Sequence, residues 1–404
     1  MEPSDDPIIT TAVRYDEWLI PADDHLLDLS RRLYNELEAN TPSPTLYHPK
    51  AAARKLAMVE NLVANIALMS AVNVAGSRLI ISARNSSRDR YQRPEFPKKA
   101  FMLIVRWMEG QGHLIRYPGI AHRVKTTLEP KGLLALFPKQ VSPRMVSRLE
   151  GAETIWLSTG STKSRKWVDY ADTPQTRQMR EEMSVINGAF RDAEIMLHGK
   201  LQGPVHLVRM FRTDHPSSER FDLHGRIFGG FWQYLPRNQR QGIRLNGQSI
   251  VELDFSSMFP RLAYIEAGEE PPDGDLYAGV GLPREAAKIS MAALLWRNGP
   301  MQRLPNKLKE LLEPGWNGNR VTAALALKHP AISGMFGTGC GLRLAYLESR
   351  VLVSALLKLV RKDIVALPMH DGLFCERGNE AACRSAMEQA SEEVLGVRLP
   401  VGKK

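Results

Sequence analysis

A predicted strand, an acid and a helix follow one another closely in the stretch Val251-Glu-Leu-Asp-Phe-Ser-Ser-Met-Phe-Pro-Arg-Leu-Ala-Tyr264. The strand is predicted by its apolar positions, which are Ile250, Val251, Leu253 and Phe255. Asp254 lies in this apolar run, where a carboxylate is too costly to keep charged unless a metal or another cation meets it. After Pro260 the apolar spacing becomes helical. Strand, acid, turn and helix together suit a divalent ion that faces a triphosphate.

A second stretch with the same design follows at Ile364-Val-Ala-Leu-Pro-Met-His-Asp-Gly-Leu-Phe-Cys375. Its apolar strand leads to Asp371, and Gly372 turns the chain into a second apolar arm. Side by side in a sheet, the two strands would bring Asp254 and Asp371 within reach of a shared pair of magnesium ions, which in-line displacement at phosphate requires. Either acid alone is more often a strand-end residue that accepts backbone hydrogen bonds, so the pairing carries the catalytic interpretation.

Between the two acids, Pro283 opens a predicted helix that runs to Trp296. Arg284 and Lys288 are one turn apart on this helix, and Trp296 lies two turns further along the same face. Two cations followed by a flat ring suit the binding of phosphates and packing against a base or sugar. Ordinary surface helices often carry Arg and Lys at this spacing, so the stretch is informative only together with the two acids.

Together, the three stretches resemble the polymerase core shared by family A DNA polymerases and single-subunit RNA polymerases. That core carries an aspartate on a strand, then an Arg-x-x-x-Lys helix with an aromatic residue eight positions after the lysine, then a His-Asp pair. The matching residues are Asp254, Arg284, Lys288, Trp296, His370 and Asp371. The segment 223–236 is similar to the Gly-Arg stretch that precedes the first motif, in which Arg226 would touch the minor groove of the primer–template. The resemblance covers roughly residues 205–404.

The sequence departs from this pattern at several positions. Its first motif, Asp-Phe-Ser-Ser-Met-Phe-Pro, is more similar to the Asp-x-x-Ser-Leu-Tyr-Pro of family B polymerases. Trp296 stands where tyrosine is usual, and Ala292 stands where DNA polymerases often have an aromatic residue. Gly372 replaces the last acid of family A, which single-subunit RNA polymerases also lack. The pattern is also similar to that of bacterial and mobile-element proteins.

The resemblance implies template-directed addition of nucleoside monophosphates to a 3′ hydroxyl. Asp254 and Asp371, with the backbone carbonyl of Phe255, would hold two Mg²⁺ ions, with Mn²⁺ as an alternative metal. Arg284 and Lys288 would clamp the triphosphate and offset the charge that grows on the leaving pyrophosphate.

Further roles follow from the same resemblance. Trp296 would stack near the nascent base pair, His370 would contact the primer terminus and Arg343 would reach the template. Phe259, five residues after Asp254, would clash with a 2′ hydroxyl, which favours dNTPs over NTPs. No three-carboxylate exonuclease precedes the core, so we expect no proofreading.

Composition indicates the class of partner. The 404 residues, 43% of them hydrophobic, suit two or three domains with their own cores. A formal net charge of +10 favours a polyanionic partner, which we expect to be a DNA primer–template. The sequence has no run of about eighteen uninterrupted apolar residues, so we expect no membrane partner. Three cysteines without metal spacing, and an acidic start without an export signal, predict a cytoplasmic protein.

The chain before the polymerase-like core predicts three regions. Residues 1–45 predict an arm packed on the body. Residues 46–140 are predicted to form two helices, a basic loop and a hairpin, an arrangement that resembles a winged helix. The six cations from Arg84 to Lys99 suit phosphate contacts. A solvated basic surface is an equal alternative for these cations. Residues 141–205 predict a β segment, a Ser/Thr/Lys-rich turn at 158–166 and a polar helix that is either thumb-like or a plain connector.

The predicted fold is therefore α+β: a right-hand polymerase core at 206–404, preceded by the winged-helix-like domain. The core would have an antiparallel palm sheet, helical fingers at about 270–330 and thumb-like helices. The predicted function is a DNA-directed DNA polymerase that uses dNTPs. The alternatives with the same core are a primase or RNA polymerase that uses NTPs and RNA, and a template-independent terminal transferase. A non-enzymatic DNA-binding replication initiator is the alternative without chemistry.

Overall fold

The computed structural model describes residues 12–40, 49–72, 77–81, 90–94, 96–119, 125–161, 164–215 and 217–404. Within these ranges the chain mixes helices and sheets, so the predicted α+β class is confirmed. Residues 1–11 and 41–45 of the predicted arm and much of the predicted basic loop, including Arg84 and Arg88, lie outside the described residues.

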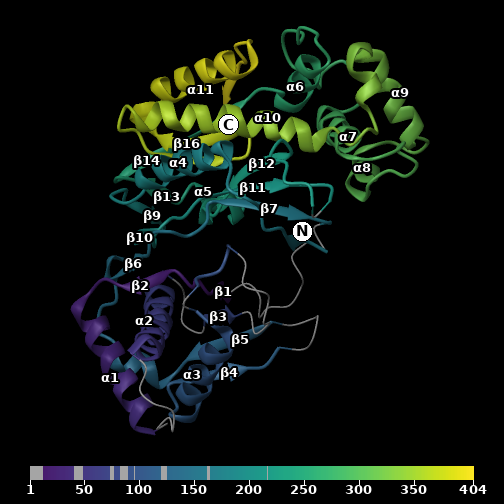
Figure 1. Ribbon diagram of the computed structural model, residues 1–404. Coiled ribbons are helices and arrows are strands. Elements are labelled where there is room, and N and C mark those ends of the chain that lie inside the picture. The colour runs from purple at the N-terminus through teal and green to yellow at the C-terminus, as the bar shows by residue number, and fades with distance from the viewer. Residues whose placement is uncertain are drawn as a thin grey trace. The chain divides into compact units, whose positions relative to one another are not determined.

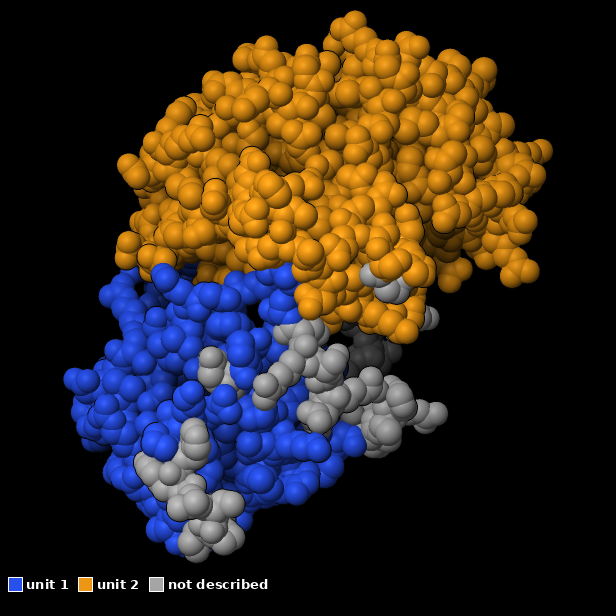
Figure 2. All heavy atoms as spheres, viewed as in Figure 1, with its two compact units in different colours: residues 1–153, 194–204 blue, residues 154–193, 205–404 orange. Residues whose placement is uncertain are grey.

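The chain forms two compact units (Figure 2). Unit 1 comprises residues 1–153 and 194–204, and unit 2 comprises residues 154–193 and 205–404. The segment predicted as a connector is thus shared between both units. The assignment of a winged-helix domain, a connector and a polymerase core to the regions of the chain stays a prediction.

Unit 1 contains a four-stranded sheet in the order β1-β3-β5-β4 and three long helices. Its elements are β1 (Ala12–Arg14), β2 (Leu19–Pro21), α1 (Asp24–Asn40), α2 (Pro49–Val72), β3 (Arg78–Ile81), α3 (Lys98–Gly110), β4 (Leu114–Tyr117), β5 (Thr126–Pro130), η1 (Gly132–Leu136), η2 (Pro143–Met145), β6 (Val146–Arg148), β9 (Ile195–Leu197) and β10 (Lys200–Leu201). The two helices and the strands predicted for 46–140 are present. The sheet also takes in β1, parallel to β3, from the predicted arm. A winged helix is not identified by this arrangement and stays a prediction.

Helix α2 forms the centre of the unit 1 core. By length and composition it is apolar enough to cross a membrane, but 56% of its most apolar window is buried inside the fold. The helix packs against α1 and α3, and its middle residues from Met58 to Ala67 are almost all buried. This burial is that of a core helix in a globular unit, and the other described helices do not meet the length and composition of a membrane span.

Unit 2 contains two sheets, covered by helices (Figure 1). Its strands are β7 (Ile155–Thr159), β8 (Lys166–Trp167), β11 (Val208–Arg212), β12 (His224–Phe228), β13 (Ile243–Leu245), β14 (Gln248–Phe255), β15 (Ala366–Met369), β16 (Gly372–Glu376) and β17 (Val401–Lys403). Its helices are α4 (Pro174–Gly188), η3 (Phe231–Tyr234), α5 (Arg237–Arg240), α6 (Met258–Glu266), α7 (Arg284–Trp296), α8 (Asn306–Leu311), α9 (Gly318–Lys328), η4 (Pro330–Met335), α10 (Gly341–Val360), η5 (Arg377–Asn379) and α11 (Glu380–Leu395).

One sheet of unit 2 follows the order β13-β14-β16-β15, with β17 paired to β14. Helices α10 and α11 run side by side along this sheet (Figure 1). Helix α10 has an apolar stripe that is buried: Leu344, Leu347, Val351, Ala355 and Leu359. The second sheet follows the order β12-β11-β7-β8, and β12 packs against α10. Helix α10 therefore contacts both sheets.

Candidate active site

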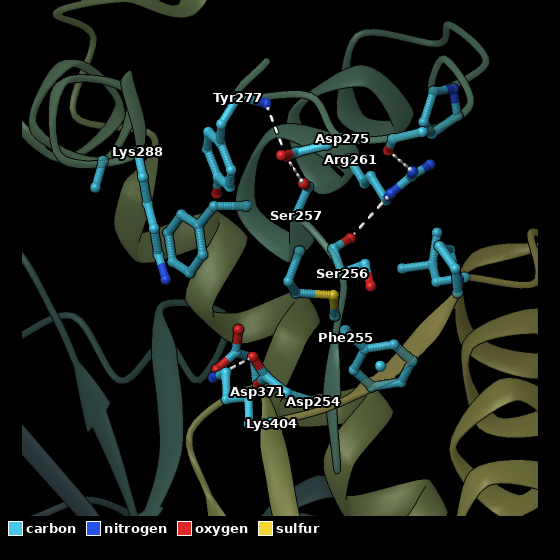
Figure 3. Close-up of a pocket in the computed structure, with 18 of the residues that line it drawn as sticks. Asp254, Phe255, Ser256, Ser257, Arg261, Asp275, Tyr277, Lys288, Asp371 and Lys404 are labelled. Carbon is cyan, nitrogen blue, oxygen red and sulfur yellow. Dashed lines mark hydrogen bonds and ion pairs between the residues drawn. The ribbon is translucent and has the colours of Figure 1, made fainter. Parts of the chain in front are cut away.

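Asp254 and Asp371 lie next to each other at the ends of two neighbouring strands. β14 and β16 are antiparallel, and Asp254 stands opposite Gly372, the residue after Asp371. The backbone N–H of Phe255 donates to the carbonyl oxygen of Asp371 at 3.3 Å, and the two side chains are close enough that the charge of Asp371 raises the pKa of Asp254. Figure 3 shows both carboxyl groups in the same space. Two acids that are distant in the sequence thus meet in the fold.

The carboxylate pair is accompanied by the ammonium of Lys404. Burial, followed by the charge of Asp371, raises the pKa of Asp254 to about 7, although an ion pair with Lys404 opposes this rise. Burial alone would lower the pKa of Lys404, but the charge of Asp254 outweighs it and the net shift is upward. Two adjacent carboxylates repel one another, so both ionise readily only when positive charge lies beside them.

The donor set of this pair fits a divalent cation. Carboxylate oxygens are the ligands that Mg²⁺ and Mn²⁺ prefer, and the mutual repulsion of the two acids is relieved when a cation joins them. Phe255, whose carbonyl is the predicted further ligand, lines the same cavity. The described residues contain no group of three or more His, Cys, Asp or Glu side chains suited to a metal. Water or substrate oxygens would therefore have to complete the coordination.

His370 begins the tight turn that carries Asp371. β15 and β16 pair Met369 with Gly372, which leaves a two-residue loop. His370 has a φ of 54°, which is in the left-handed region. Two-residue hairpin loops require such positive values and therefore favour glycine at this position. Its buried Nδ1 has no hydrogen-bond partner within the described residues, and burial lowers the pKa of its imidazole. A strained residue with an unpaired polar atom, beside a candidate catalytic acid, points to a functional role.

Gly372 is required by close packing of the two strands. A Cβ atom at this position would lie 2.3 Å from the carbonyl oxygen of Leu253 and 2.9 Å from Oδ1 of Asp254. No side chain fits at these distances without displacing β14. Glycine at position 372 therefore has a steric reason in this fold.

A cavity of about 1170 Å³ extends from the carboxylates to α7. Arg284, Lys288 and Trp296 line it from that helix, so the structure brings these residues and the two acids to one cavity. Lys288 extends from α7 toward the side on which Asp371 lies (Figure 3). Within the described residues Lys288 has no ion pair.

Arg284 has a carboxylate partner that the sequence analysis did not identify. Its Nε lies 2.5 Å from Oδ2 of Asp275, and its Nη2 lies 3.3 Å from Oδ1. Asp275 also accepts hydrogen bonds from the backbone N–H of Tyr277 at 3.1 Å and from Oγ of Ser257 at 3.4 Å. Hydrogen bonding to Arg284 lowers the pKa of Asp275. Any phosphate that binds Arg284 must therefore share it with Asp275 or replace that partner.

Phe259 and Trp296 form a stacked pair on the wall of the cavity. Their ring centroids are 5.8 Å apart at an interplanar angle of 23°. The guanidinium of Arg226 lies 5.4 Å from the Phe259 ring and 5.6 Å from the Trp296 ring. Phe259, which is predicted to select the sugar, thus contacts Trp296, which is predicted to stack on the base pair.

Arg226 is bound through two of its nitrogens to the buried carboxylate of Glu348 on α10. Its Nε and Nη2 donate to Oε1 and Oε2 at 2.7 and 2.8 Å, and the Glu348 side chain is 1% exposed. Arg226 also lines the cavity. Its contact with a primer–template stays a prediction, and such a contact would have to use its remaining nitrogen or break this pair.

Arg343 and His370 do not line the cavity. Arg343 lies on α10, where its Nε is 3.2 Å from Oε1 of Glu266. Its side chain is 39% exposed, so it is accessible although paired. The predicted contact of Arg343 with a template stays a prediction.

Among the further cavity residues that carry a charge or a hydroxyl are Asp275, Tyr277 and Lys404. Burial and then the charge of Asp371 raise the pKa of Tyr277, so its hydroxyl stays protonated. In the sequence, only the acidic loop before the Arg284 helix could have indicated that Asp275 belongs to the site. No motif or spacing connects Lys404 with the acids.

Glu348 gives the fold a specific pH dependence. Burial raises the pKa of Glu348 to about 7, although the charge of Arg226 opposes this rise. An unfolded glutamate releases its proton near pH 4.3, so the stability that Glu348 contributes is full below that pH and is lost as pH rises to about 7. Between these pH values we expect the wild type to lose on the order of 1–3 kcal/mol of unfolding free energy relative to Glu348→Gln. Urea unfolding of both proteins across this pH range measures the difference in their unfolding free energies. A difference that does not change with pH would contradict the expectation.

Comparison with known proteins gives limited similarity. No family model and no curated protein matches the chain. One similar solved structure is the POL domain of Pol1 from M. smegmatis in complex with DNA primer-template and dNTP. The TM-score is 0.33 and the sequence identity 13%, over 57% of this chain and 50% of that chain. The chain thus spans about half the length of that structure, and a similarity of this size assigns neither a detailed fold nor an activity.

Proposed function

We propose that the protein is a nucleotidyltransferase that extends a 3′ hydroxyl on a nucleic-acid template, as a DNA polymerase without proofreading. One observation carries the proposal: the adjacent carboxyl groups of Asp254 and Asp371 share a cavity with Arg284 and Lys288 of α7. Paired acids for divalent cations and cations for a triphosphate are the parts that phosphoryl transfer requires. The formal net charge of +10 supports a nucleic-acid partner.

Each part of the site has a proposed role in the reaction. Asp254 and Asp371, with the carbonyl of Phe255, would hold Mg²⁺ or Mn²⁺. When bound, such ions polarise the phosphoryl group and lower the pKa of the attacking hydroxyl. Lys288 would offset the negative charge that develops on the leaving pyrophosphate. Arg284 would bind phosphate oxygens in the bidentate geometry that it now uses with Asp275.

His370 is proposed to contact the primer terminus. Burial keeps its imidazole neutral, and its Nδ1 is a buried polar atom that has no partner within the described residues. A hydroxyl or phosphate oxygen of a primer terminus would satisfy this atom if the histidine tautomer carries its proton there. Arg226 and Arg343 are proposed to contact the primer–template.

Phe259 is proposed to select the sugar, because its ring lines the cavity and is held by stacking on Trp296. Phe259→Ala removes the ring that would clash with a 2′ hydroxyl. We expect the preference for dNTP over NTP, measured as the ratio of kcat/KM values, to fall by about 10- to 100-fold. Tyr234→Ala is the matched control, because Tyr234 is a 71% exposed aromatic outside the cavity lining. An equal loss with both nucleotides would remove Phe259 from sugar selection.

Primer extension tests the proposed function and separates its alternatives. A labelled primer–template is incubated with Mg²⁺ and either dNTPs or NTPs, and the same primer is offered without a template strand. Extension that needs dNTPs and template supports the proposal. Use of NTPs alone would indicate a primase or RNA polymerase, and template-free extension would indicate a terminal transferase. DNA binding without nucleotide addition in any arm would leave a replication initiator or regulator.

A further inference from the structure

One face of the four-stranded sheet in unit 2 combines tryptophans with cations. Along β7 and β11 the alternate residues Ile155, Leu157, Arg209 and Phe211 are buried. The residues between them belong to the opposite face. With their neighbours on and before β8, the side chains of that face are here named the tryptophan face: Trp156, Arg165, Trp167, Met210 and Arg212.

The two tryptophans form a rigid aromatic platform at the edge of the sheet. Trp167 on β8 pairs with Ser158 on β7, and the Trp156 and Trp167 rings meet edge to face with centroids 4.7 Å apart. The Trp167 side chain remains 37% exposed. The guanidinium of Arg165 lies 5.7 Å from the Trp167 ring. A fixed and accessible indole beside a guanidinium suits the stacking of a base with a phosphate contact next to it.

The positive charge of this face is not neutralised by the described residues. Arg165 and Arg212 form no ion pair within the part of the chain that the structure describes. Arg212 lies close enough to Arg165 that, after burial, the charge of Arg165 lowers its pKa further. The nearby imidazole of His224 stays neutral, because burial lowers its pKa to about 4; a hydrogen bond with the Met210 backbone opposes this shift, and the charges of Arg226, Arg212 and Arg165 add to it. Like charges held together without carboxylates destabilise a fold unless a polyanion joins them.

The tryptophan face leads across the sheet to the cavity. Trp156 is in register with Met210 on β11, and Met210 is in register with Arg226 on β12. Arg226 lines the cavity that holds the acids. From β8 to β12 there are three strand spacings, about 14 Å in all. A few nucleotides of single strand would span this distance.

We propose that the tryptophan face binds a single-stranded segment of nucleic acid, with a base stacked on Trp167 and phosphates held by Arg165 and Arg212. Bases in a single strand are available for stacking, whereas those of a duplex are hidden in its own stack. The binding site does not depend on the proposed chemistry. If the proposed function also holds, the strand on this face is continuous with the one that enters the cavity.

Equilibrium binding of a labelled oligothymidylate to the full chain tests the proposal, with EDTA present and nucleotides absent. Removing one base-stacking ring costs about 1–3 kcal/mol, so Trp167→Ala is expected to weaken binding about 5- to 150-fold. Arg165→Gln and Arg212→Gln are each expected to reduce the slope of log K against log salt by about 0.7. Trp167→Phe keeps a stacking ring and should restore most of the affinity. An oligouridylate of equal length shows whether RNA serves as well as DNA.

Two controls make the result specific to this face. Leu327→Ala removes another exposed apolar side chain of unit 2, on α9, and should leave the affinity unchanged. A duplex of the same length should be insensitive to Trp167→Ala, and an equal loss on duplex would overturn the stacking contact. Wild-type affinity and salt slope in Trp167→Ala and both arginine variants would overturn the proposal. Because no catalysis is measured, a chain that binds the strand but adds no nucleotide would refute the proposed function alone.

Discussion

Asp371→Asn is expected to reduce nucleotide addition by at least about 10³-fold, because the amide removes one of the two carboxylates that would hold divalent cations and stabilise the transition state by several kcal/mol. The amide has nearly the shape of the acid, and the hydrogen bond from the backbone N–H of Phe255 to the backbone carbonyl of Asp371 does not use the side chain. Single-turnover primer extension in Mg²⁺ measures the loss. Asp254→Asn should behave alike, although it also leaves Lys404 without its ion-pair partner.

Glu310→Gln is the matched control for this prediction. Glu310 is an exposed carboxylate on α8, outside the cavity and without an ion pair in the described residues. It should extend primers at the wild-type rate. DNA affinity should be similar in all these variants. If Asp371→Asn extended as fast as the parent, the protein would not use these acids for catalysis and the enzymatic interpretation would be lost.

Lys288→Met is expected to have the second largest effect, a loss of about 10²–10³-fold in kcat, the size seen when one preorganised charge donor is removed. Lys288 lines the cavity and has no ion pair within the described residues, whereas Arg284 is already bound to Asp275. Its ammonium is therefore available for the charge that develops on a pyrophosphate. Methionine keeps the aliphatic stem of the side chain, so the change removes mainly charge.

The control for Lys288 lies on the neighbouring helix. Lys309 on α8 is exposed and has no ion pair within the described residues, so Lys309→Met should leave kcat unchanged. Separate values of kcat and KM distinguish two roles of Lys288. A higher KM for dNTP with unchanged kcat would mean that Lys288 binds ground state and transition state equally and does not assist departure of pyrophosphate.

The elements around the site were predictable because their patterns are strong. The strand at Asp254, the turn at Asp371 and the helix from Arg284 to Trp296 are all present where apolar spacing and turn residues indicated them. The adjacency of the two acids followed from two similar strand-and-acid stretches. Periodicity carries this information because buried faces repeat along the chain.

The ion-pair partners around the site were not predictable in the same way. Asp275 binds Arg284, Glu348 binds Arg226 and Lys404 binds Asp254. Such contacts join single residues on different elements, so they leave no repeat in the sequence. The sharing of the predicted connector between two units has a similar cause, since residues 194–204 associate with unit 1 through long-range packing.

The close packing at Gly372 limits how negative the free site can become. Because a Cβ there would meet the Leu253 carbonyl and the Asp254 carboxylate, a third acid cannot be installed at this position without parting the two strands. The strand ends therefore carry the two carboxylates of Asp254 and Asp371, and Asp254 is already paired with Lys404. Such a site attracts divalent cations weakly until a triphosphate adds its own oxygens. Under the proposed function, the expected order of assembly is therefore nucleotide together with its cation, rather than cation first.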